Sequence, residues 1–197
     1  MTREELLKIA KPILFNTEMV QAILEGRKTC TRRAIKPQAK KIYWNPASYP
    51  NGWTDEHGYQ RKEPYQTGDI LYVRETWQHN PIPTGWPYDY KASPEYNSIE
   101  HEKWKPSIHM PKTAARIFLK VTDVRVERLQ DMSIQDMINE GVKASDITTN
   151  RGVIEYRVAN RFQELWDSTI KKKELDMYGM DANPWVWVIE FERVEKD

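Results

Sequence analysis

Residues 19–33 read MVQAILEGRKTCTRR, an apolar run that leads directly into four cations and two threonines. The apolar residues recur at helical spacing, which predicts one buried helix face. Thr17 can cap the start of this helix, and Gly26 can adopt the left-handed conformation that ends it. We therefore expect a helix over residues 17–25 that holds the cationic cluster in a fixed place.

The charge of the chain is unevenly distributed. From Gly26 to Thr54 there are seven Lys or Arg residues and no Asp or Glu, although the whole chain of 197 residues has a formal net charge of +1. Such an uneven distribution indicates a negatively charged partner. The alternative is a solvated surface without a binding role, which is the usual place of Lys and Arg. Thr29 and Thr31 favour binding, because threonine hydroxyls bond phosphate oxygens or act as nucleophiles beside an amine base.

The cationic run resembles the G-x-K-T-x-T-x-R signature of ASCH domains, a branch of the PUA-like superfamily, through Gly26, Lys28, Thr29, Thr31 and Arg33. Three later segments resemble blocks of the same family in the same order, namely residues 68–77, 117–129 and 185–191. The extra segments between these blocks are most similar to the longer ASCH proteins encoded by phages and prophages. The resemblance implies a single α+β domain over residues 1–197, built on a PUA-like, small, mostly antiparallel β-barrel with flanking helices.

The hydrophobic pattern agrees with a small barrel better than with a regular alternation of strands and helices. Short apolar or alternating segments predict four strands, at residues 12–15, 69–76, 117–126 and 185–191. Ser133 and Asp136 form a capping-box pattern that starts a helix ending at Gly141, and a further helix begins near Glu155. We expect the loop over residues 28–33 and the end of the Ser133 helix to open onto one mouth of the barrel.

Two insertions, residues 34–66 and 78–112, separate the family blocks. The stretch they span carries ten of the twelve prolines and many of the aromatic residues. Segments stiffened by proline and rich in Trp and Tyr tend to be ordered. Their rings either form a satellite core under long loops or provide a wall on which a nucleobase stacks. Trp44 and Trp53 lie nearest to the basic run and are the candidates for stacking.

The resemblance also implies a chemistry. Compact bacterial ASCH proteins include amidohydrolases that act on N4-acetylcytidine with a lysine, a threonine and a glutamate, and the motif carries the first two roles to Lys28 and Thr31. The glutamate of these proteins lies in a helix after the long strand, and its counterpart by pattern is Glu140, just before Gly141. A lysine takes the proton of a threonine hydroxyl only when its pKa falls from about 10.4 towards neutrality. Like-charge repulsion from the neighbouring arginines would lower the pKa of Lys28 in this way.

Two functions from different classes remain open. The first is binding of RNA, or of a nucleotide or modified nucleoside, in a basic cleft of the barrel. Its candidate ligand contacts, beside Lys28, are Arg27, Thr29, Arg32, Arg33, Trp44, Trp53 and Glu75. The second is a metal-independent amidohydrolase that removes an acyl group from a modified pyrimidine nucleoside such as N4-acetylcytidine. The breadth of functions on one fold favours binding, and the retained catalytic set favours the enzyme. A third possibility is an interaction protein without a nucleic-acid role.

Several other classes of site lack support in the sequence. The four histidines and Cys30 show no metal-ligand spacing, so no metal is expected. No phosphate-binding glycine loop or dinucleotide fingerprint occurs, so no cofactor is expected. No apolar stretch approaches the ~20 residues of a membrane span, and the N-terminus lacks the apolar region of a signal peptide. We therefore expect a soluble cytoplasmic protein, and a lone cysteine, which excludes an internal disulfide, fits a reducing compartment.

Overall fold

A computed structural model describes residues 1–48, 52–79, 86–93, 103–143 and 151–195, with the backbone alone described for residues 151–155. Parts of the two expected insertions, residues 49–51, 80–85 and 94–102, lie outside the described residues. The chain forms two compact units. The first unit comprises Met1–Thr29, Thr67–Thr122 and Phe191–Asp197, and the second comprises Cys30–Gln66 and Asp123–Glu190.

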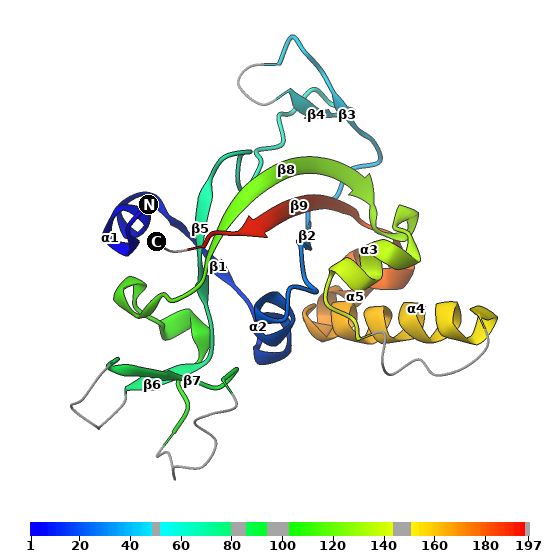
Figure 1. The fold of residues 1–197 in the computed structure, drawn as a ribbon. Helices are drawn as coiled ribbons and strands as arrows, with labels where there is room; N and C mark the ends of the chain where they lie inside the picture. The colour runs from blue at the N-terminus through cyan, green and yellow to red at the C-terminus, as the bar shows by residue number, and fades with distance from the viewer. Residues whose placement is uncertain (49–51, 80–85, 94–102, 144–150, 196–197) are drawn as a thin grey trace. The chain divides into compact units, whose positions relative to one another are not determined.

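The first unit begins with two helices, α1 (Arg3–Ile9) and α2 (Thr17–Leu24) (Figure 1). The predicted helix over residues 17–25 is thus confirmed as α2, and Gly26 follows it with a φ of 73°. Its cap is Asn16 and not Thr17, because the Asn16 side chain accepts a hydrogen bond of 2.8 Å from the backbone N–H of Met19. The other elements of this unit are β1 (Lys11–Leu14), β5 (Ile70–Arg74), β6 (Trp77–His79), β7 (Tyr88–Tyr90), η2 (Ser107–His109), η3 (Lys112–Ala114) and the start of β8 (Phe118–Arg128).

The second unit contains a helical layer and a small hairpin. The predicted capping box is present, since Ser133 and Asp136 bond each other's backbone N–H groups at the start of α3 (Ile134–Asn139), and Gly141 follows with a φ of 106°. Helix α4 (Arg151–Ser168) packs against α3, and both share a core with Val186 and Val188. The other elements are β2 (Cys30–Ala34), β3 (Ile42–Trp44), β4 (Trp53–Asp55), η4 (Leu129–Asp131), η6 (Lys172–Glu174), α5 (Leu175–Tyr178), η7 (Met180–Ala182), the end of β8 and most of β9 (Trp185–Arg193).

The fold is mixed α+β, with one main sheet and two small ones. Five strands are hydrogen-bonded in the order β1-β5-β8-β9-β2, and β3-β4 and β6-β7 form separate hairpins. β1 is parallel to β5, whereas β5 is antiparallel to β8 and β2 is antiparallel to β9. All four predicted strands are present, but among the described residues the sheet is open and does not close into the expected barrel. Pro12 in β1 explains one open edge, since proline lacks the N–H that a further strand would need.

Candidate functional site

The end of the basic run is a strand and not the expected loop. Residues Cys30–Ala34 form β2, which pairs with β9 so that Thr31 lies opposite Ile189 and Arg33 lies opposite Trp187. Successive side chains of a strand point to opposite faces. Two adjacent arginines of the run, Arg32 and Arg33, are therefore directed to different faces of β2.

Arg32 lies at the centre of a buried ion cluster in the second unit. Its side chain is fully buried, and the carboxylate of Glu127 accepts hydrogen bonds of 2.6 Å from Nη2 and 2.8 Å from Nε. Glu140 Oε1 lies 3.4 Å from Nη1 and Asp136 Oδ1 lies 3.6 Å from Nη2. Burial by itself would lower the pKa of Arg32, but the charges of Glu140 and Glu127 outweigh it and raise that pKa above its usual value. The charge of Arg32 is thus balanced within the protein.

The guanidinium of Arg33 has a different environment. Nη1 donates to the hydroxyl of Thr31 at 3.1 Å and to the carbonyl of Arg32 at 3.2 Å. Burial lowers the pKa of Arg33, although Glu140 and Tyr65 act in the opposite direction. Burial thus makes the charged form of Arg33 less favourable than it is in water. Thr31, which shares this face, is 1% exposed.

Three tryptophan rings, each in contact with the next, connect the strand position opposite Arg33 with the surface of the second unit. Trp187, directly opposite Arg33, is buried and meets Trp53 edge to face, with ring centroids 6.2 Å apart. Trp53 meets Trp44 edge to face at 5.4 Å. Trp44 is 55% exposed. The two rings predicted as candidates for base stacking thus have different environments. Trp53 belongs partly to a satellite core, whereas Trp44 is exposed to solvent.

Glu140 is brought to the basic strand, as the sequence analysis expected for the end of the Ser133 helix. It is the C-cap residue of α3, it is 4% exposed, and it lies within ion-pair distance of Arg32. Its charge also favours the charged form of Arg33. A short capped helix therefore places one carboxylate near two guanidinium groups of β2.

The remaining residues of the run belong to the first unit. Lys28 is 2% exposed, and its Nζ lies 5.4 Å from the ring centroid of Phe15. Arg27 forms an ion pair of 2.6 Å with Glu25. The exposed Thr29 accepts a hydrogen bond at its carbonyl from the backbone N–H of Phe191. Arg27, one of the cations next to Lys28, thus has a carboxylate partner of its own in this unit.

Glu75, another predicted ligand contact, is held by a buried ion pair in the first unit. Arg116 donates from Nε and from Nη2 to its two carboxylate oxygens, both at 2.8 Å, and Glu75 is 1% exposed. Burial raises the pKa of Glu75, while Arg116 acts to lower it. The guanidinium of Arg116 also donates to Ser93 and stacks over Tyr90. Glu75 therefore has a structural partner that the sequence analysis did not identify.

Several other residues of these clusters were not predicted. Glu127 lies just beyond the predicted strand 117–126, Asp136 is predicted only as a capping residue, and Trp187 lies in the predicted strand 185–191 without a role of its own. Nothing in a single sequence marks their partners, because these lie many positions away along the chain. The one signal in the sequence is that residues 30–33 can form a strand. Successive side chains of a strand point to opposite faces, so a strand there predicts different environments for Arg32 and Arg33.

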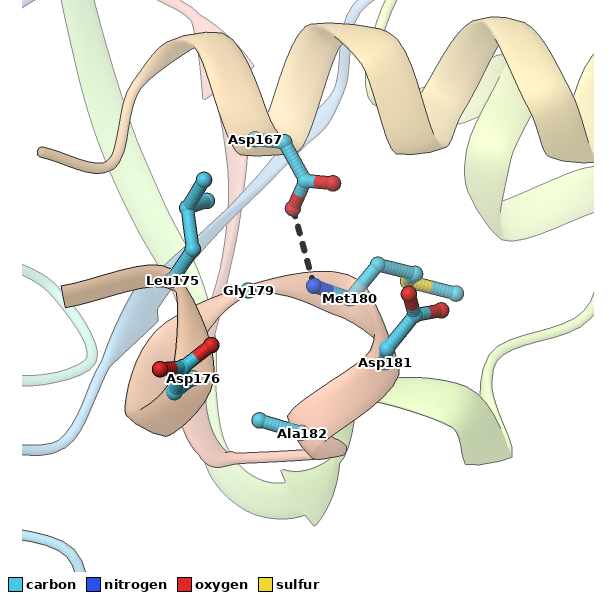
Figure 2. Close-up of a pocket in the computed structure, with 7 residues that line it drawn as sticks. All are labelled: Asp167, Leu175, Asp176, Gly179, Met180, Asp181 and Ala182. Carbon is cyan, nitrogen blue, oxygen red and sulfur yellow. Dashed lines mark hydrogen bonds between the residues drawn. The ribbon is translucent and has the colours of Figure 1, made fainter. Parts of the chain in front are cut away.

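A separate hollow of about 370 Å³ lies in the second unit, away from the predicted residues (Figure 2). One of its carboxylates, Asp167, accepts a hydrogen bond of 2.9 Å from the backbone N–H of Met180, as Figure 2 shows. Its lining residues are Asp167, Leu175, Asp176, Gly179, Met180, Asp181 and Ala182.

Over the described part of the chain, no group of three or more His, Cys, Asp or Glu side chains is arranged to hold a metal ion.

Within the residues that the structure describes, no helix combines the length and the apolar character needed to cross a bilayer.

Comparisons with known proteins supply no function for this chain, so the geometry of the site is the guide. No family model, no curated protein and no solved structure matches this chain.

Proposed function

We propose that this protein binds RNA, or a nucleotide or modified nucleoside, through the face of β2 that carries Thr31 and Arg33. The observation that supports the proposal is the arrangement of a guanidinium and a hydroxyl beside three successive tryptophan rings, the last of which is exposed. A guanidinium suits phosphate oxygens, and aromatic faces suit nucleobases.

The proposal assigns different roles to the two adjacent arginines. Arg33 contacts the ligand, because its guanidinium lies beside the Thr31 hydroxyl on the face of β2 opposite to the Arg32 ion cluster. Arg32 positions β2 against Glu127 and Glu140, because its charge is already balanced. The basic run therefore offers fewer phosphate contacts than its composition suggests.

Membership of the ASCH branch of the PUA-like superfamily remains part of this proposal and rests on the motifs in residues 26–33, 68–77, 117–129 and 185–191. The open mixed sheet is compatible with the order of those motifs, although the closed barrel is not observed among the described residues. Fold resemblance alone does not assign a function, so the argument depends on the residues of β2 and their partners.

Calorimetric titration with a ten-nucleotide single-stranded RNA and with N4-acetylcytidine tests the proposal. Arg33→Gln removes the charge that a phosphate would meet, so we expect the RNA affinity to fall about 10- to 100-fold, the range for a hydrogen bond to a charged group. Lys172→Gln is the matched control, because it removes an exposed cation of η6 in the same unit. The proposal fails if neither ligand binds, or if Arg33→Gln binds RNA as tightly as the control.

A second candidate function is the metal-independent amidohydrolase. The observation that favours it is burial of the polar side chains that resemble the catalytic set, since Thr31, Glu140 and Lys28 are each 4% exposed or less. Buried polar groups cost free energy, and such groups gather where chemistry requires them. In this alternative the Thr31 hydroxyl attacks the acyl carbon while Lys28 takes its proton, and the C–N bond breaks as Glu140 helps to return a proton to the leaving amine. Water then hydrolyses the acyl ester on Thr31, which releases the carboxylate and restores the hydroxyl.

Acetate release from N4-acetylcytidine without added metal tests this alternative. Thr31→Ala and Lys28→Ala should each remove most of the turnover, and Glu140→Gln should slow it, because nucleophile and base act as one unit. The rate should rise with pH through the pKa of Lys28, since a neutral amine is needed to accept the proton. Thr67→Ala is the control, because Thr67 is an exposed threonine outside the predicted binding and catalytic residues. Full turnover in Lys28→Ala, or none in the wild type, contradicts this mechanism.

A further inference from the structure

We propose that the ring of Trp44 is a stacking platform for an unpaired base of single-stranded RNA, with Lys40 and Lys41, which precede β3 in the chain, for phosphates further along the strand. This inference rests on the proposed function and adds the class of ligand to it. The ligand is a strand that reaches the β3–β4 hairpin, and a free nucleoside would not use this part of the protein.

Trp44 is exposed and yet held in position. Trp44 as a residue is 55% exposed, and its ring makes an edge-to-face contact with Trp53. Trp53 is itself anchored, because its ring meets the buried Trp187 and its side chain is hydrogen-bonded to Glu63. A large exposed ring of this kind loses little further freedom when a base stacks on it, so the contact is less costly to form.

Gly52 provides the space that keeps the ring in place. It has a φ of 75°, and a Cβ built on it would lie 2.7 Å from atoms of the Trp44 ring. A side chain at this position would therefore displace the ring. The hairpin supports this arrangement through Asp55, whose carboxylate bonds the backbone N–H groups of His57 and Tyr59 and forms an ion pair of 2.6 Å with Arg61.

Two lysines that precede β3 in the chain, Lys40 and Lys41, carry charges that suit a polyanion. Lys40 and Lys41 are exposed, and no ion pair of either ammonium group is present among the described residues. The nearby carboxylate of Glu56 accepts hydrogen bonds of 3.1 Å from the backbone N–H groups of both lysines. The backbone N–H of Glu56 itself and those of Lys41 and Lys40 lower the pKa of Glu56. Glu56 thus binds the backbone of this segment, while the ammonium group of Lys41 lies 5.6 Å from the ring centroid of Tyr43.

A single strand is the occupant that these features favour. A base already stacked in a duplex cannot also stack on a protein ring, whereas every unpaired base presents a free face. Two ring-to-ring steps, of 6.2 and 5.4 Å, separate Trp44 from the ring opposite Arg33. A single strand of several nucleotides can contact Arg33 and Trp44 together, with one base on the exposed ring and a phosphate at the guanidinium.

The test compares a ten-nucleotide single-stranded RNA, a duplex of the same sequence and the mononucleotide CMP by fluorescence anisotropy or calorimetry. Trp44→Ala should weaken single-strand binding about 5- to 100-fold, the equivalent of one lost base stack. Trp44→Phe should recover most of it, and neither change should alter CMP binding. Tyr156→Ala is the control, because Tyr156 is an aromatic residue of α4 in the same unit that is 69% exposed.

Two further measurements keep the inference falsifiable if Trp44→Ala folds poorly. Irradiation of the wild-type protein with an RNA that contains 5-iodouracil should cross-link residue 44, because that base couples to aromatic rings on which it stacks. Gly52→Ala should reduce the cross-link by displacing the ring. Wild-type affinity in Trp44→Ala, or cross-links that avoid Trp44 while Arg33→Gln still weakens binding, overturns the stacking platform but leaves the proposed function intact. Failure of every nucleotide ligand to bind overturns both.

Discussion

Arg32→Met removes the cation from a buried cluster that holds the carboxylates of Glu127, Asp136 and Glu140. Glu127 and Glu140 lie 2.6 and 3.4 Å from the guanidinium nitrogens, and Glu140 is 4% exposed. Removing one partner of a buried ion cluster typically costs about 3–5 kcal/mol, because the remaining desolvated charges lose their nearest counter-charge, and here Arg125 still lies 3.5 Å from Glu127. We expect the lower half of this range, since the side chains of Glu127 and Asp136 keep 20% and 31% of their exposure to water.

The loss should depend on pH in a defined direction. Burial acts to raise the pKa of Asp136, but the hydrogen bonds from Ser133 and the charges of Arg32 and Arg125 lower that pKa below its usual value. A carboxyl whose pKa is lowered by folding contributes stability above its unfolded pKa of about 4 and loses it as the pH falls. Arg32→Met removes part of that contribution, so the difference from the wild type should be largest at pH 7 and smaller at pH 3.5.

Urea unfolding of the wild type, Arg32→Met and Glu140→Gln at pH 7 and pH 3.5 measures these differences. Glu140→Gln is the matched comparison, because it removes one of three carboxylates and leaves the cation in place, so its cost at pH 7 should be smaller. A loss below about 1 kcal/mol for Arg32→Met, the range of exposed ion pairs, would refute the buried cluster. A loss that is equal at both pH values would refute its electrostatic origin.

Three further predictions concern other residues. If Arg33, Lys40 and Lys41 neutralise about three phosphates, the logarithm of the RNA association constant should fall against the logarithm of the salt concentration with a slope near −2. The double variant Lys40→Gln with Lys41→Gln should make this slope shallower by roughly 1.4, which binding assays at several salt concentrations measure. The pKa of Glu75 is raised by folding, so Glu75 contributes stability below its unfolded pKa, and this contribution is lost as the pH rises through its folded pKa. Glu75→Gln should abolish this pH dependence. Identical profiles of melting temperature for the variant and the wild type from pH 4 to 7 would contradict the prediction. Ser133→Ala removes the capping hydroxyl of α3 and should cost about 1 kcal/mol in urea unfolding, whereas Ser107→Ala, in η2 and without a side-chain cap bond, should cost little.

The elements that the sequence alone determined are those stabilised by neighbours along the chain. Helix α2 follows from apolar residues at helical spacing and from Gly26, and α3 follows from Ser133 and Asp136, which bond each other across three positions. The strands at 118–128 and 185–193 were likewise predicted from alternation. Closure of the sheet was not predictable in the same way, because pairing of edge strands depends on backbone groups far apart in sequence.

Tertiary structure decided the roles within the basic run. Arg32 and Arg33 are adjacent and chemically identical, and a charge count treats them alike. Strand pairing with β9 turns them to opposite faces, and the folded chain then brings Glu127 and Glu140, from about a hundred residues away, to Arg32. The pKa of Arg32 is raised and that of Arg33 is lowered, because the energy of a buried charge depends on the groups that surround it in space.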